Sequence, residues 1–350
     1  MTQTILVIGG YGKVGSTISR QLAALYPYKV IAAGRNFKKA DELAKAADYK
    51  IIPKKFDVLN DTDDDILENV QLVIMCIDQE NTDFLFKCIS KGIDYIDITA
   101  ENSFFEKAAA LHTIAELKQA TILLSVGLAP GISNLLAKHA LNSLTASTKV
   151  DLYILLGLGE KHGDAAYKWT FNNIHDSYNV SRSFNNTTIK SFSNPKRTNL
   201  EGSRTFYTFN FSDQHILSKT TQAEVITRFA FESRFLTVAT GVLRKYGITK
   251  IFGNSYFQKL LLYIFKNFSV GTDVFAVKAV ASHTDRTVYE STITGNCESK
   301  ITAYTTVLSA LELLKKESKP GVYHLHEIVN DIPRFLNQLK GYDPSVKIKL

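Results

Sequence analysis

The chain has 350 residues, of which 45% are hydrophobic and 21% are charged, and its formal net charge at pH 7 is +7. A chain of this length can bury a large core, and we expect it to form two domains. Its apolar runs are too short to span a bilayer, which takes roughly 20 residues, and the first run lacks the basic flank and the length of a secretion signal. The sequence therefore predicts neither a membrane partner nor a secreted protein.

The cysteines, lysines and histidines argue against a disulfide-stabilised protein, a nucleic-acid-binding protein and a metal site. Cys76, Cys88 and Cys297 are few and scattered, which predicts a reducing, cytoplasmic location and no disulfide framework. The lysines are dispersed among acids, with no basic run interleaved with aromatic residues, so no nucleic-acid partner is predicted. His324 and His326 flank a single leucine without an evident third ligand, and no metal site is predicted.

The first elements in the chain are a strand, a glycine-rich turn and a helix. An apolar run over residues 4–8 leads into the turn, and apolar residues recur at helical spacing over residues 14–25. This order is typical of a dinucleotide-binding turn: Gly9 allows the tight turn, Gly12 lets backbone approach a pyrophosphate, and Gly15 lets the helix pack on the strand. The residues that we predict to bind a dinucleotide here are Gly9, Gly10, Tyr11, Gly12, Lys13, Val14 and Gly15.

Strand and helix patterns alternate through the first 125 residues. Such alternation predicts a parallel, doubly wound sheet of the Rossmann type, with its ligand at the carboxyl ends of the strands. The predicted strands are Thr4–Ile8, Lys29–Ala33, Tyr49–Phe56, Leu72–Ile77, Tyr95–Ile98 and Thr121–Val126.

The end of the second predicted strand indicates the cofactor. An acidic residue there would favour the bare ribose of NAD, but the chain has Gly34, Arg35 and Asn36, followed by lysines. Arg35 offers a planar fork of donors to a phosphate, so we expect NADP, with NAD as the second choice. The other predicted cofactor-binding residues, at this end of the sheet, are Asn36, Lys39, Asp57, Val58, Ile77, Asp78, Thr99, Gly127 and Pro130.

Five stretches of the sequence carry a family resemblance. The segments IGGYGKVG, GRNFKKADELA, DYIDITAE, VGLAPGISNLLA and KPGVYHLHEI resemble the saccharopine dehydrogenase family, in its reductase-type, NADP-binding branch with lysine 6-dehydrogenase-like and carboxynorspermidine dehydrogenase-like members. The resemblance is strong over residues 1–140 and 300–335. Ala129 stands where many saccharopine-forming members carry an acidic residue, so saccharopine itself is not the expected substrate.

The resemblance implies an activity and a discontinuous layout. Residues 1–126, completed by 303–350, would form the NADP-binding domain, and residues 127–302 would form a substrate-binding and dimerisation domain of a homodimer. The implied function is an NADP-dependent oxidoreductase that transfers hydride at a C–N bond of a small-molecule amino acid, imine or opine-like substrate.

The middle of the chain has a different pattern, which predicts an inserted α+β domain with a largely antiparallel sheet. Residues 181–203, rich in Ser, Asn and Thr, predict a mobile loop or hairpin. The predicted strands are Val150–Leu156, Thr205–Phe211, Phe235–Thr240, Val274–Ala281 and Thr287–Thr294, and the predicted helices are Thr220–Phe231, Ser255–Phe268 and, near the C-terminus, Tyr304–Lys316.

Catalytic residues are predicted from chemistry alone. Hydride transfer at a C–N bond needs a group that manages a proton and a cation that holds the substrate carboxylate. Glu101, just past the fifth strand, is the first candidate for the proton, and Tyr167 and His175, from a polar and aromatic cluster with Lys168 and Trp169, are the next. The arginines that could bind a carboxylate are Arg182, Arg204, Arg228, Arg234 and Arg286.

Two alternatives remain open. An atypical short-chain dehydrogenase would use a Tyr-xxx-Lys pair on a helix, and Tyr246 and Lys250 have that spacing, although Gly247 weakens a helix there. A non-catalytic redox sensor would bind NADP without turnover.

Overall fold

The computed structural model describes residues 3–60, 64–144, 148–160, 164–182, 185–267, 271–283 and 288–350. The chain divides into two compact units. Unit 1 comprises Met1–Ile132 and Ser299–Tyr342, and unit 2 comprises Ser133–Glu298 and Asp343–Leu350. This differs from the expected layout, which placed all of residues 303–350 in the first domain, because β16 (Lys347–Lys349) pairs with β14 (Val288–Asn296) of unit 2.

Unit 1 is built on a seven-stranded sheet in the order β15-β6-β5-β4-β1-β2-β3, and the neighbouring strands of this sheet pair in parallel. Its central strands are buried on both faces, as parallel strands covered by helices are, and therefore read as continuous apolar runs. The strands are β1 (Thr4–Ile8), β2 (Val30–Gly34), β3 (Ile51–Lys55), β4 (Val70–Met75), β5 (Asp94–Asp97), β6 (Thr121–Leu124) and β15 (Gly321–His324).

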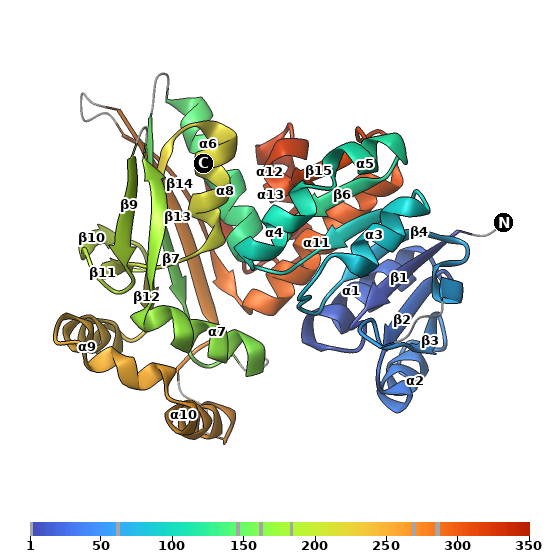
Figure 1. The fold of residues 1–350 in the computed structure, drawn as a ribbon, viewed down its shortest axis with the longest axis horizontal. Helices are drawn as coiled ribbons and strands as arrows, with labels where there is room; N and C mark the ends of the chain where they lie inside the picture. Colours follow the sequence, from blue (N-terminus) through green and yellow to red (C-terminus); the bar gives the residue numbers. More distant parts are fainter. Residues whose placement is uncertain are drawn as a thin grey trace. The chain divides into compact units, whose positions relative to one another are not determined.

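Helices connect the strands of unit 1 (Figure 1). The helix after β1 buries Ile18 and Leu22, the apolar stripe that the sequence predicts. The elements are α1 (Lys13–Leu25), α2 (Phe37–Lys45), η1 (Asp64–Leu67), α3 (Asp83–Ser90), α4 (Asn102–Ala109), α5 (His112–Leu117), the turn η2 (Leu128–Ile132), α11 (Glu298–Leu314), α12 (Leu325–Ile328) and α13 (Ile332–Tyr342).

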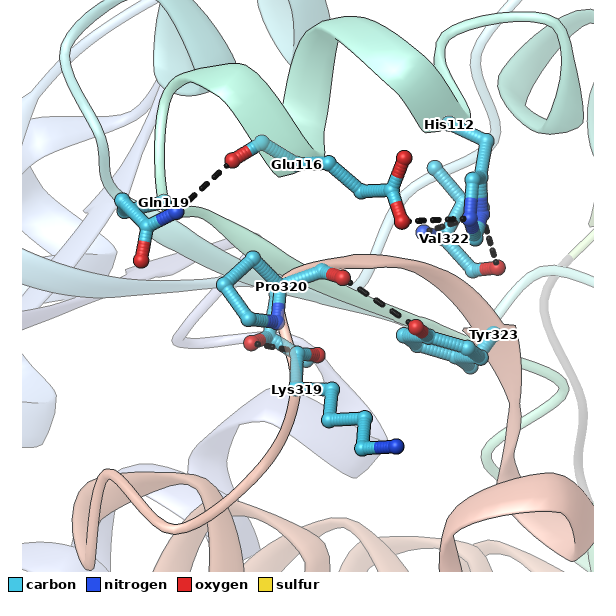
Figure 2. Close-up of polar contacts among 8 residues, drawn as sticks. His112, Glu116, Gln119, Lys319, Pro320, Val322 and Tyr323 are labelled. Carbon is cyan, nitrogen blue, oxygen red and sulfur yellow. Dashed lines mark hydrogen bonds and ion pairs between the residues drawn. The ribbon is translucent and has the colours of Figure 1, made fainter.

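The strand β15 joins unit 1 from the far end of the chain. It pairs with β6 and is held from α5, where His112 Nδ1 lies 3.1 Å from both the amide nitrogen and the carbonyl oxygen of Val322 (Figure 2). The other ring nitrogen of His112 lies 3.4 Å from a carboxylate oxygen of Glu116, and the Tyr323 hydroxyl donates to the Pro320 carbonyl at 3.1 Å. These contacts fix a segment that is distant in sequence at the edge of the sheet.

Unit 2 is built on a mixed sheet in the order β10-β11-β12-β7-β13-β14-β16, in which only β12 and β7 pair in parallel among the described strands. A separate hairpin pairs β8 with β9. The strands are β7 (Lys149–Leu156), β8 (Ser177–Arg182), β9 (Asn185–Lys190), β10 (Lys196–Asn199), β11 (Ser203–Thr208), β12 (Glu224–Phe231), β13 (Val274–Ser282), β14 and β16. The predicted α/β fold class, with an inserted, largely antiparallel α+β domain, is confirmed.

The helices of unit 2 pack on this sheet and on one another. α6 contacts β13 and β14, α8 contacts β12, and α9 contacts β11 and β12. Both α9 and α10 contact the intervening turn η3. The elements are α6 (Ser133–Ser143), α7 (Asp164–His175), α8 (Ser212–Thr221), α9 (Arg234–Lys245), η3 (Ile248–Gly253) and α10 (Ser255–Asn267).

Two elements of unit 2 have the opposite type to the one that the sequence predicts. Residues 224–231 form the strand β12 instead of a helix, because they are buried between β11 and β7 and carry the β-branched residues that suit a central strand. Residues 234–245 form the helix α9 instead of a strand, and Ser233 caps it by accepting a hydrogen bond from the Leu236 amide at 3.2 Å. Residues 181–203 contribute to the β8–β9 hairpin and to β10.

Candidate functional site

The site is built on the turn between β1 and α1. Gly9 has φ +74°, a conformation that side chains with a Cβ rarely adopt, so the turn requires glycine there. A Cβ on Gly15 would lie 2.3 Å from the Gly9 carbonyl oxygen, and one on Gly10 would lie 2.8 Å from that of Val7. Glycine at these positions therefore lets α1 pack directly on β1, as the sequence predicts.

Gly12 has a different environment from the other glycines of the turn. A Cβ built there meets only the Gly9 carbonyl oxygen, at 3.1 Å, and otherwise faces open space. Gly12 is also the N-cap of α1, which has no side-chain cap and no acidic residue in its first turn. A helix N-terminus of this kind, approached closely by backbone alone, suits an anion such as a diphosphate.

Tyr11 links this turn to the end of β2. A Cβ on Gly34 would lie 2.6 Å from the Tyr11 ring, so the ring packs on Gly34, and the Tyr11 hydroxyl accepts a hydrogen bond from the Asn36 amide at 2.9 Å. The Asn36 side chain in turn caps α2 by accepting from the Lys39 amide at 3.2 Å. The turn and the residues beyond β2 thus form one connected surface.

Charged residues lie at the ends of β2 and β3. Arg35 and Lys39 are exposed. The pKa of the Asp57 carboxyl is held below its ordinary value by a hydrogen bond from the Asn60 side chain, by the Leu59 amide and by the charge of Arg35. Asp57 is thus ionised and lies within the electrostatic reach of Arg35, while the next residue, Val58, is half-buried.

The ends of β4 and β5 bring together several of the predicted residues. Ile77 packs against the turn, since a Cβ on Gly9 would lie 2.8 Å from Ile77 Cγ2. Burial raises the pKa of Asp78, which Thr99 partly offsets by a hydrogen bond. Burial and the charge of Asp78 raise the pKa of Glu101, which is half-buried at the N-cap of α4 without capping it by its side chain. Two neighbouring carboxyls here therefore hold protons at higher pH than ordinary ones.

A buried network at the same strand ends is absent from the sequence-based prediction. The fully buried Asp97 accepts hydrogen bonds from the Thr99 amide at 2.7 Å, the Gln79 side chain at 3.0 Å and the Tyr95 hydroxyl at 3.2 Å. Burial nevertheless raises the pKa of Asp97 to about 7. The available signal was a strand that carries two carboxylates, Asp94 and Asp97, since Asp is almost never fully buried without a partner.

The turn after β6 holds Gly127 and Pro130 in buried positions. The Leu128 amide donates to the Thr302 hydroxyl of α11 at 3.3 Å, and Gly131, with φ +137°, lies close to the Ser125 carbonyl. Gly127 and Pro130 thus build the turn, although we predict them as cofactor contacts.

Tyr167 and His175 lie eight residues apart on α7 of unit 2, whereas Glu101 belongs to unit 1. The Tyr167 hydroxyl donates to the Glu160 carbonyl at 3.3 Å, and the His175 ring packs against Gly253 of η3. Trp169 packs on Phe209 and Phe211. Tyr167, Trp169 and His175 are half-buried and make separate contacts within unit 2, so they do not form one cluster.

The candidate arginines differ in whether their guanidinium groups already bind other groups of the protein. Arg228 is buried in an ion pair with Asp151, and Arg204 donates to the carbonyls of Glu201 and Glu232. Arg234 is exposed. The side chain of Arg182 and the whole of Arg286 lie outside the described residues.

The two residues of the Tyr-xxx-Lys string do not share a helix. Tyr246 is the C-cap of α9, Gly247 has φ +74°, and Lys250 lies in η3. The arrangement that a short-chain dehydrogenase uses is not formed by this pair.

Over the residues that the structure describes, no group of three or more His, Cys, Asp or Glu side chains is arranged to hold a metal ion. Across those same ranges, no helix combines the length and the apolar character needed to cross a membrane.

Comparison with known proteins gives a family match for the region that contains the turn between β1 and α1. Residues 5–123 match the family described as "Saccharopine dehydrogenase NADP binding domain". The fold resembles that of apo saccharopine dehydrogenase (L-Glu forming) from Saccharomyces cerevisiae, with 16% identity, coverage of 99% of this chain and 100% of that chain, and a TM-score of 0.68. A dihydrodipicolinate reductase from Paenisporosarcina sp. TG-14 is more distant, with 8% identity, coverage of 94% and 100%, and a TM-score of 0.43. A search of curated proteins gave no match.

Proposed function

We propose that this chain, whose residues 5–123 match the saccharopine dehydrogenase NADP-binding domain, is a member of the saccharopine dehydrogenase family and an NADP-dependent oxidoreductase acting at a C–N bond. The substrate class that we propose is an amino acid, an imine or an opine-like compound. The observation that carries the proposal is the open N-terminus of α1 at Gly12, within a domain of NADP-binding type.

In this proposal, backbone of the turn between β1 and α1 binds the diphosphate. The tight packing at Gly10 and Gly15 brings the N-terminus of α1 close to the end of β1, and the open side of Gly12 leaves room for the ligand. Arg35 and Lys39 then bind a 2′-phosphate, since a guanidinium offers a phosphate two parallel hydrogen bonds. When bound, the cofactor supplies or accepts the hydride.

Glu101 is the residue that we propose to hold the reaction's proton. A C–N bond that gains hydride also gains a proton at nitrogen, and a carboxyl with a raised pKa is suited to donate it near neutral pH. Burial and the neighbouring Asp78 give Glu101 this property. Tyr167 and His175 remain proposed substrate contacts of unit 2, and we propose that unit 2 also supplies the dimer contacts of a cytoplasmic homodimer.

Turnover tests the proposal directly. Purified protein is incubated with NADPH and a panel of imines and of 2-oxo acid and amine pairs, and loss of NADPH absorbance is followed. We expect oxidation with at least one pair, and deuteride from labelled NADPH should appear on the carbon that bears nitrogen in the product. NADPH binding without oxidation of any of them would instead identify a non-catalytic redox sensor.

A further inference from the structure

Three consecutive elements of unit 2, α9, η3 and α10, carry exposed side chains that are apolar or basic. Both helices contact η3, and we call the exposed side of the three elements the α9–α10 face. Its large hydrophobic side chains follow helical spacing, which places them in stripes along the two helices. The exposed members are Phe235, Val238 and Val242 on α9, Tyr246, Ile248 and Ile251 at the junction, and Tyr256, Leu260 and Tyr263 on α10.

The exposed area is larger than a monomer in water normally tolerates. Phe235 is 83% exposed, Tyr256 is 80%, Tyr246 is 71% and Tyr263 is 62%. An aromatic side chain buries roughly 150–250 Å² when it is covered, so these four alone present several hundred Å². Exposed apolar surface of this size is typical of an interaction site.

The charge of the same segment limits what can cover it. Residues 233–272 contain the cations Arg234, Arg244, Lys245, Lys250, Lys259 and Lys266 and not one Asp or Glu. Arg244 is occupied by the carbonyls of Ser191 and Asp176, whereas Arg234, Lys245, Lys250 and Lys259 are exposed. The exposed cations of this face favour an anionic partner.

A small cavity with three arginines lies at the start of α9. Its volume is about 180 Å³, and Arg197, Arg204 and Arg234 line it together with hydroxyl side chains, but without a carboxylate among the described lining residues. Two carbonyls hold Arg204, and Ser203 Oγ accepts from Arg197 Nε at 2.8 Å. Convergent guanidinium groups of this kind suit a phosphate group.

Glu201 and Glu232 lie within electrostatic reach of Arg204, but neither lines the cavity. Glu232 precedes α9, but its carboxylate accepts hydrogen bonds from the amide and the hydroxyl of Thr272, at 2.8 and 2.7 Å. Val238 and Arg234 belong both to the cavity lining and to the exposed part of α9. The phosphate-sized cavity thus opens beside the apolar stripe.

We propose that the α9–α10 face docks on the surface of a membrane that contains anionic phospholipids, with the three-arginine cavity receiving a headgroup phosphate. Aromatic and aliphatic side chains on one face, with cations around them and no acids, are typical of segments that lie in the membrane interface. Cations near such a surface are attracted to anionic lipids. The expectation of no membrane partner considered spanning runs only, and a docked face does not span.

A second copy of the chain fits this face less well. A twofold dimer brings the same patch of both copies together, so one basic patch would face an equally basic patch. Like charges across an interface are unfavourable, whereas lipid phosphates compensate them.

The test is cosedimentation of the full chain with vesicles. We expect binding to vesicles of phosphatidylcholine with 30% phosphatidylserine, weaker binding in high salt, and no binding to pure phosphatidylcholine. The double variant Phe235→Ser/Tyr256→Ser removes apolar contacts, and Lys245→Glu/Lys250→Glu reverses charge. Each should weaken binding by at least about tenfold. Arg234→Ala should weaken it by roughly fivefold.

The matched control is Tyr28→Ser/Leu117→Ser, which replaces two exposed hydrophobic residues of unit 1 and should bind vesicles as the unchanged protein does. Light scattering tests whether a second copy of the chain covers this face, and titration with inorganic phosphate tests whether the cavity binds free phosphate. Absence of vesicle binding overturns the proposal, whether accompanied by a dimer that Phe235→Ser/Tyr256→Ser dissociates or by phosphate binding alone. Equal loss of binding in the control also overturns it.

Discussion

Residues 4–25 and residues 220–245 are both rich in apolar side chains, yet only the first stretch shows its structure in its sequence. In the first, Gly9 is required by its positive φ and Gly10 and Gly15 by close backbone contacts, so their spacing specifies a strand, a turn and a helix in that order. In the second, strand β12 and helix α9 follow one another without such a constraint, and the sequence predicts them in reverse. Steric requirements at the backbone are thus more informative than apolar content.

The largest expected effect is on NADPH binding, and it should distinguish Gly12 from Gly15, two glycines of the same turn. Gly12→Val should abolish NADPH binding, a loss of more than about 1,000-fold, while the melting temperature stays close to that of the unchanged protein. Gly12 has φ −69°, which valine adopts readily, and only its open side is filled. Fluorescence titration with NADPH and calorimetry measure the two properties.

Gly15→Val is the companion variant. Its Cβ would lie 2.3 Å from backbone, so it should destabilise unit 1 itself. Unchanged NADPH affinity in Gly12→Val would show that the turn is structural only.

A large effect on turnover is expected at Glu101. Glu101→Gln keeps the size of the side chain but cannot exchange a proton, and it should lower kcat by roughly 100-fold or more with little change in the NADPH dissociation constant. Because the pKa of Glu101 is raised, reduction by the unchanged enzyme should fall only at a pH above the ordinary range of a carboxyl. A normal pH–rate profile in the variant would remove Glu101 from the mechanism.

Cofactor choice should depend on Arg35. Arg35→Ala should weaken NADPH by about 10- to 150-fold, because a charge-assisted hydrogen bond contributes roughly 1.5–3 kcal/mol, and NADH should be nearly unaffected. Arg35→Asp should shift preference further toward NADH, since a carboxylate repels the 2′-phosphate. Lys45→Ala, at the far end of α2, is the control. Equal affinity of the unchanged protein for both reduced cofactors would contradict the choice of NADP.

The buried Asp97 should make stability depend on pH. Its folded-state pKa of about 7 lies above the ordinary value, so the folded protein binds the extra proton, and stability should decrease as pH rises from about 4 to about 7. Asp97→Asn should remove this part of the slope, a change of roughly 1–4 kcal/mol. Melting temperatures across pH 4–8 for both proteins measure it, and parallel curves would contradict the assignment.

The smallest expected effect is on stability, and it concerns α9, the helix that the sequence predicts as a strand. Ser233→Ala removes the side chain that accepts from the Leu236 amide and should cost about 1 kcal/mol of unfolding free energy. Ser233→Asp should retain the cap. If denaturant unfolding shows no difference between Ser233→Ala and Ser233→Asp, another feature fixes the start of α9.

The sequence predicts some parts of the fold and of the candidate site but not others. The order of strands and helices in residues 1–125 was readable because polar and glycine residues mark each strand end, and the same marks identify the residues around Gly12 and Arg35. The Asp97 network could not be predicted, because Gln79, which follows β4, reaches Asp97 only through the pairing of β4 with β5, although Tyr95 lies on the same strand as Asp97. In unit 2, β12 is buried on both faces, and a buried strand and a buried helix have similar apolar content.

The pairing of β15 with β6 has a consequence for how the protein folds. Gly321 and Thr121 are neighbours in the sheet but lie 200 residues apart in the chain. Closing so long a loop is slow relative to forming local contacts, and until it closes β6 is an open edge that another chain could pair with. The contacts that His112 makes with β15 are therefore expected to form late in folding, and refolding at high protein concentration should lose material to aggregation at this step.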